Sequence, residues 1–80
     1  MTKEAIFEKV RDIISDKLAF DPNKIRLDSS FINDLKADSM DILDLVDGLD
    51  EEFNITIPEE SGRTFETVGD VVDFLSTVVK

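Results

Sequence analysis

The sequence predicts an all-α protein: a small four-helix bundle with three longer helices, one short helix and a long loop between the first two helices. Apolar residues recur at offsets of three and four along three separate segments, which is the spacing of one face of a helix. No pair of segments has the alternating pattern of paired strands. The 80 residues are expected to form a single domain, 1–80.

The first helix is predicted from about Lys3 to Lys17, with Thr2 as its N-cap. About 20 residues then lead to the next helix, which is a long connection for a small domain, and a turn is expected at 21–23. We expect this loop to be pinned by its own apolar side chains, with a short turn of helix around 31–35. The apolar residues are Ile6, Val10, Ile13, Ile14 and Leu18 on the helix, and Ile25, Leu27, Phe31, Ile32 and Leu35 in the loop.

The second helix is predicted from about Ser39 to Phe53. Asp38 is a suitable N-cap, and Asp41 stands where it completes a capping box with it. At about 100° per residue, one stripe of this helix is apolar and buries against the other helices. The stripe consists of Ile42, Leu45, Val46, Leu49 and Phe53.

Two further helices are predicted in the C-terminal third of the chain. After an extended linker, Pro58 is placed to open a short helix near 59–62. The last helix begins at Thr67, where Asp70 completes a second capping box. Its apolar face consists of Val68, Val71, Val72, Leu75 and Val79.

Composition excludes several classes of function. Nineteen acidic residues against nine basic ones give a net charge of -10, which opposes nucleic-acid binding and favours basic partners. The chain has no cysteine and no histidine, so Ser-His-Asp and Cys-His catalysis are excluded and we expect no enzyme and no metal centre. There is no long apolar run and no signal-like N-terminus, so we expect a cytoplasmic protein without membrane insertion. A monomer is expected.

The run "ADSMDILDLVDGLDEEF", residues 37–53, holds seven acidic residues and no basic one. A calcium-binding loop does not fit it, because Gly48 in the glycine position puts Leu43 and Leu45 at ligand positions. On the helix, Met40 and Leu43 fall inside the acidic arc. They form either the apolar centre of a docking surface with a charged rim or a contact packed under the long loop.

Ser39 lies in the first turn of this helix. A serine there is commonly only a helix starter. The free amides and the positive dipole end also make the position suitable for a phosphate ester. No base in the chain activates the hydroxyl, so another protein would have to install such a group.

The run "DLKADSMDILDLVDGLDEEFNITIP" resembles the signature of the acyl carrier protein family, and the resemblance extends over nearly the whole chain. It implies a freestanding carrier in which Ser39 holds 4'-phosphopantetheine, attached from coenzyme A by a phosphopantetheinyl transferase, with Asp38 beside it. The arm would carry acyl intermediates of fatty acid biosynthesis as thioesters. Partner enzymes would dock basic patches onto the second helix.

The resemblance also implies two residue sets. Partner-binding residues would be Met40, Asp41, Leu43, Asp44, Asp47, Asp50 and Glu51, and the lining of an acyl pocket would be Ile42, Val46 and Leu49. Three departures affect partner choice: Met40 replaces a leucine, Lys36 stands where glycine is frequent, and Asp47-Gly48 replaces a methionine-alanine type of pair. The alternatives are a specialised carrier for polyketide, lipid A-type or aminoacyl pathways, and an unmodified acidic interaction module.

Overall fold

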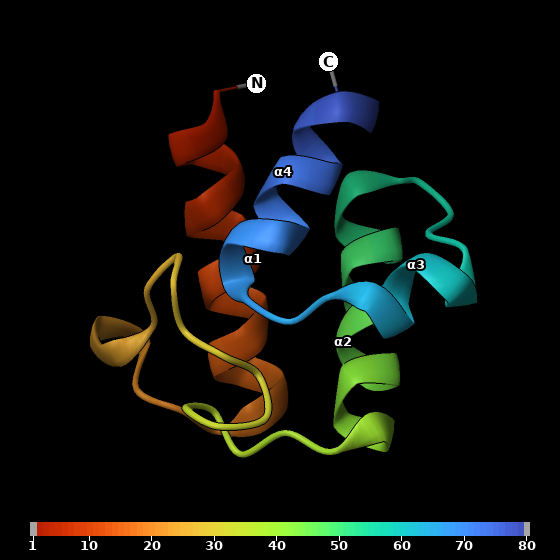
Figure 1. The fold of residues 1–80 in the computed structure, drawn as a ribbon. Helices are drawn as coiled ribbons and strands as arrows, with labels where there is room; N and C mark the ends of the chain where they lie inside the picture. The colour runs from red at the N-terminus through yellow and green to blue at the C-terminus, as the bar shows by residue number, and fades with distance from the viewer. Residues whose placement is uncertain (1, 80) are drawn as a thin grey trace.

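Four α-helices and one 3-10 turn make up the fold in the computed structural model, which describes residues 2–79. The helices are α1 (Lys3–Leu18), α2 (Ser39–Phe53), α3 (Glu59–Thr64) and α4 (Val68–Val78), and the turn η1 is Pro22–Lys24. In Figure 1, α1 packs against both α4 and α2, and the short α3 lies against α2. The prediction of an all-α, four-helix protein with a long first loop is confirmed.

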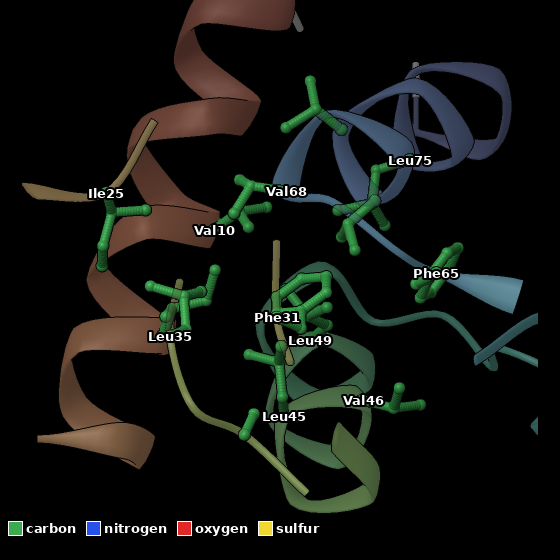
Figure 2. Packing of buried hydrophobic residues seen from close by; sticks show 14 of the residues in the cluster. Val10, Ile25, Phe31, Leu35, Leu45, Val46, Leu49, Phe65, Val68 and Leu75 are labelled. Carbon is green, nitrogen blue, oxygen red and sulfur yellow. The ribbon is translucent and has the colours of Figure 1, made fainter. Parts of the chain in front are cut away.

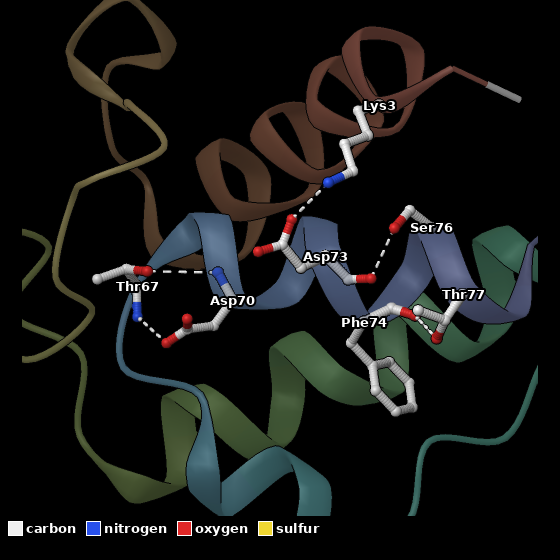
Figure 3. A network of polar contacts seen from close by, with 7 residues as sticks. All are labelled: Lys3, Thr67, Asp70, Asp73, Phe74, Ser76 and Thr77. Carbon is white, nitrogen blue, oxygen red and sulfur yellow. Dashed lines mark hydrogen bonds and ion pairs between the residues drawn. The ribbon is translucent and has the colours of Figure 1, made fainter.

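The capping residues predicted from the sequence set the helix boundaries. The Thr2 hydroxyl accepts a hydrogen bond from the Ala5 amide (3.1 Å) and starts α1. At α4, the Asp70 amide donates to Thr67 Oγ1, and the Asp70 carboxylate accepts from the Thr67 amide (Figure 3). Both caps agree with the prediction, and α3 runs slightly further than expected, to Thr64.

The long loop, residues 19–38, is anchored at the start of α4. The amides of Val68 and Gly69 have no partner within their own helix. They donate instead to the carbonyl oxygens of Ser29 (3.1 Å) and Leu27 (2.7 Å). The loop therefore caps the N-terminus of α4 before it continues to α2. These two hydrogen bonds fix the position of the loop against the bundle.

Apolar side chains pin this loop only in part, which corrects the sequence-based expectation. The buried ones are Ile25, Phe31 and Leu35, whereas Leu27 is 51% exposed and Ile32 is 67% exposed. Phe31 points into the core (Figure 2), so its chain neighbour Ile32 faces outward. The loop thus presents two large apolar side chains to solvent.

The short turn of helix expected at 31–35 is a single hydrogen-bonded turn. The amides of Asp34 and Leu35 both donate to the Ser30 carbonyl oxygen, each at 2.9 Å. The Ser30 hydroxyl also accepts a hydrogen bond from the Asn33 amide (3.1 Å). Ser30 thus supplies the acceptors for three amides of the turn, which has no continuous helical hydrogen bonding. The segment is compact but does not form a helix.

The core lies between α1, α2, α4 and the loop (Figure 2). Phe31 is the loop's main contribution and is almost fully buried. From α2, Leu45, Val46 and Leu49 are buried, as predicted, which turns the opposite face of the helix outward. The buried hydrophobic residues are Ile6, Val10, Ile14, Ile25, Phe31, Leu35, Ala37, Leu45, Val46, Leu49, Ile57, Phe65, Val68, Val71, Val72 and Leu75.

Candidate functional site

Ser39 is the first residue of α2 and is exposed to solvent. Asp38 precedes it as the N-cap, and its Oδ1 accepts a hydrogen bond from the Asp41 amide (2.9 Å). The Asp41 carboxylate in turn accepts from the Asp38 amide (3.2 Å), so the predicted capping box is present. These two hydrogen bonds fix the backbone on both sides of Ser39 and so fix the position of the serine at the start of α2.

The helix start beside Ser39 can hold a phosphate group. The first amides of an α-helix lack intrahelical acceptors, and the capping box satisfies only that of Asp41. The amides of Ser39 and Met40 remain to meet a phosphate oxygen, and the helix dipole adds to the attraction. The carboxylates of the capping box oppose it, since they carry the same sign of charge as a phosphate.

A groove of about 720 Å³ lies between α2, the end of α3 and the long loop, and Ser39 is one of the residues that line it. Its apolar side chains come from the loop, from α2 and from the segment that follows α3. Its polar side chains come mainly from the loop and from the end of α3. The groove is lined by Ser30, Ile32, Asn33, Ser39, Ile42, Leu43, Gly62, Arg63, Phe65 and Glu66. A flexible chain attached to Ser39 would therefore find both hydrogen-bonding groups and an apolar surface.

The three residues predicted to line an acyl pocket occupy different depths. Ile42 lines the groove and is half-buried. Val46 and Leu49 lie in the core and do not line the groove. Val46 instead supports α3, because a Cβ added to Gly62 would lie 3.2 Å from Val46 Cγ2. Their part in sheltering cargo stays a prediction.

One exposed stripe of α2 carries most of the predicted docking residues. Met40, Asp44, Asp47 and Glu51 follow one another at helical spacing and are all exposed. Met40 is 75% exposed, and Leu43, on the groove side of this stripe, is 41% exposed. The alternative that these two apolar residues pack under the long loop is therefore wrong. They stand among carboxylates on an open surface.

Asp50 differs from the other predicted docking residues because its carboxylate has a structural partner. The side chain is half-buried, and Oδ1 accepts a hydrogen bond from the Ile57 amide at 2.9 Å. This contact ties the linker before α3 back to α2. Asp41 is likewise half-buried and engaged in the capping box.

Gly48 faces α1, so of the Asp47-Gly48 pair that was expected to affect partner choice only Asp47 lies on the exposed stripe. A Cβ at Gly48 would lie 3.1 Å from Lys17 Cε and 3.2 Å from Ile13 Cγ2. On the same side, Lys9 Nζ forms an ion pair with Glu52 Oε1 at 3.0 Å. The lysines that offset the acidic helix come from α1, so a count of charges on α2 alone misses them.

Seven residues that line the groove were not predicted as site residues: Ser30, Ile32, Asn33, Gly62, Arg63, Phe65 and Glu66. Ile32 was expected to be a loop anchor, and its place beside Phe31 was the available signal for an outward side chain. Arg63 and Phe65 come from α3 and the segment after it, which meet α2 only through tertiary packing. The sequence around these two residues has no periodic pattern that predicts packing against α2.

No group of three or more potential ligands is placed to hold a metal ion within residues 2–79. None of the helices in this part of the chain is long and apolar enough to cross a membrane.

Comparison with known proteins gives consistent results. Residues 8–75 match the family model for a phosphopantetheine attachment site. The acyl carrier protein of Clostridium acetobutylicum is 50% identical over 70 residues, covering 88% of this chain and 91% of the relative. That of Thermosynechococcus vestitus is 43% identical over 79 residues, covering 99% and 98% of the two chains. A solved structure from Mycobacterium tuberculosis, provisionally assigned as an acyl carrier protein, is 28% identical with a TM-score of 0.84, covering 90% of this chain and 96% of the other.

Proposed function

The chain belongs to the acyl carrier protein family, and on this premise we propose that Ser39 carries the phosphopantetheine arm and that the cargo is acyl intermediates of fatty acid biosynthesis. The observation that carries the proposal is the position of Ser39, exposed at the start of α2 and at the edge of the groove. When attached, the arm supplies a terminal thiol that holds acyl groups as thioesters. The protein itself carries and presents; partner enzymes do the chemistry.

The residues around Ser39 have distinct tasks in this proposal. Asp38 and Asp41 hold the helix start in one geometry through the capping box. The amides of Ser39 and Met40, which the capping box leaves free, would donate to the phosphate of the arm. Ile42, with the other apolar residues of the groove, offers the acyl chain a surface away from water.

The exposed stripe of α2 serves partner docking in this proposal. Its carboxylates raise the encounter rate with basic patches, and the net charge of -10 extends that attraction beyond the contact itself. Met40 and Leu43 supply apolar contact among these charges. Phosphopantetheinyl transferase and the enzymes of fatty acid synthesis are the proposed partners, and we propose a cytoplasmic monomer.

A specialised carrier is the second candidate, and the groove's polar residues favour it. Arg63 and Glu66 line the groove together with Ser30 and Asn33. A purely hydrocarbon cargo gains nothing from such groups, whereas a hydroxylated, aminoacyl or carboxylated cargo does. The two candidates share the arm and the docking stripe and differ only in what the arm carries.

Transfer from coenzyme A tests the carrier assignment. The apo protein is incubated with coenzyme A and a transferase of broad specificity, and the intact mass is measured. We expect the wild type to gain one phosphopantetheine and Ser39→Ala to gain none. Ser30→Ala, which alters another serine of the same groove, is the matched control and should be modified. An unmodified wild type, or a modified Ser39→Ala, would refute the assignment.

The groups found on the protein isolated from its own cells separate the two carrier candidates. Malonyl and straight-chain acyl groups on the arm support fatty acid synthesis. If amino acids or branched polyketide chains are the main groups on the arm, the role in fatty acid synthesis is refuted and the protein is a specialised carrier. Mass spectrometry of the released arm reads either outcome without knowledge of the partner enzymes.

Charge reversal tests the docking stripe. We expect Asp44→Lys to raise the KM of the transferase for the apo protein, with an effect that shrinks as salt is added. Asp28→Lys makes the same change of charge at an exposed loop position away from the groove and is the control. Equal effects of the two variants at low salt would mean that only net charge matters and that the stripe has no special part.

A further inference from the structure

We propose that Ile32, in the long loop, is a docking residue for the enzyme that attaches the arm to Ser39. The partner surface then spans the groove from the loop to α2. This inference rests on the proposed function, because it presupposes modification of Ser39. The partner is an enzyme whose surface has an apolar contact for Ile32 and basic residues around it.

Ile32 belongs to a group of three exposed apolar residues that share the groove or the chain with Ser39. Ile32 and Leu43 line the same groove as Ser39, and Met40 follows the serine in the chain. Their exposed fractions are 67%, 41% and 75%. A single exposed apolar side chain needs no explanation, but three around one reactive position indicate a contact surface. We refer to Ile32, Met40 and Leu43 as the apolar ring.

The outward position of Ile32 is built into the turn rather than left to a mobile loop. Phe31 is almost fully buried on one side of it, and the Phe31 amide donates to the Glu66 carbonyl oxygen at 3.0 Å. On the other side, the Asn33 amide donates to Ser30 Oγ at 3.1 Å. With both neighbours held, the Ile32 side chain has no route into the core.

The reaction at Ser39 decides which partner needs this surface. Ser39 Oγ forms a bond to the phosphorus of coenzyme A's pantetheine phosphate, and the pyrophosphate bond breaks. Adenosine 3',5'-bisphosphate leaves, and the hydroxyl proton passes to a base on the partner. Ser39 Oγ and the phosphorus atom must approach to about 3 Å, so the transferase has to contact the protein surface next to Ser39. Enzymes that act on the far end of the arm have no such requirement.

The acidic rim fits the same partner. Asp38 flanks Ser39, and Asp44 and Asp47 continue the exposed stripe of α2 beyond the apolar ring. An apolar centre with a charged rim is the usual arrangement of a specific transient interface. The rim attracts a basic surface, and the ring gives the bound complex its buried contact.

The test compares steady-state kinetics of arm attachment for Ile32→Ser, Ile32→Val and the wild type, with coenzyme A and a transferase. We expect Ile32→Ser to raise the KM for the apo protein about ten-fold with little change in kcat, which is the loss expected for one aliphatic side chain removed from an interface. Ile32→Val should stay close to the wild type. All variants should keep the wild-type unfolding midpoint, because the side chain lies largely in solvent.

Leu27→Ser is the matched control. Leu27 is also an exposed apolar residue of the long loop, but it borders a different hollow, between α1 and α4. We expect it to be modified like the wild type. Equal KM values for Ile32→Ser and Leu27→Ser would overturn the inference and leave the function of Ser39 intact. A wild type that gains no arm at all would instead refute the proposed function.

Discussion

Lys36 adopts a backbone conformation that glycine tolerates better, and replacing it should stabilise the protein. Its φ is 58°, in the left-handed region, two positions before the capping residue Asp38. For a residue with a Cβ this region costs about 1–2 kcal/mol. The same position was noted in the sequence as one where related carriers frequently have glycine, and the backbone supplies the physical reason.

The net gain is smaller than the strain. Glycine has more freedom in the unfolded chain, which costs roughly 0.5–1 kcal/mol relative to a residue with a side chain. We therefore expect Lys36→Gly to raise the free energy of unfolding by about 0.5–1 kcal/mol. For a domain of this size the unfolding midpoint should rise by roughly 2–8 °C.

The assay is thermal and urea unfolding of three proteins: wild type, Lys36→Gly and Lys36→Ala. Lys36→Ala removes the same charge but keeps a Cβ, so it retains the strained conformation. We expect Lys36→Gly to be more stable than Lys36→Ala. Equal stability of the two variants would refute the argument from backbone strain and assign any change to the lost charge.

Three further predictions concern packing and one structural carboxylate, each measured by urea unfolding. Phe31→Ala should destabilise the protein by about 3–5 kcal/mol, because the ring is almost fully buried; a smaller cost would mean that the loop is not part of the core. Asp50→Ala should cost about 1–2 kcal/mol by leaving the Ile57 amide without its acceptor, and a neutral result would assign Asp50 to docking alone. Gly48→Leu should be less stable than Gly48→Ala by about 1–3 kcal/mol, because the larger side chain overpacks against Ile13 while both variants lose the glycine, whereas equal stability would mean that α1 moves aside.

Local rules predicted the helices well. The bounds of α2 and both capping boxes follow from short-range chemistry, since Asp38 and Thr67 satisfy amides three residues away. The buried stripe of α2 likewise follows from helical spacing, which needs no knowledge of the neighbour. These features depend on contacts within a few residues.

Tertiary placement accounts for the errors. The position of Gly48 on the helix was known, but which element lies over it depends on how α1 packs. The loop has no helical period, so its one signal for the exposure of Ile32 was the place of this residue beside Phe31. The contribution of Arg63 to the groove depends on how α3 packs against α2. The positive φ of Lys36 could not be predicted from the residue type, because lysine has no preference for the left-handed region.

The central claim is that Ser39 carries the phosphopantetheine arm. The most direct measurement is peptide mapping of the protein purified from its own cells, with the site of the added group read by fragmentation in a mass spectrometer. We expect the group on the peptide that contains Ser39, attached to that residue. The same group on another serine, or a protein that never carries it in those cells, would show that Ser39 is not the attachment site.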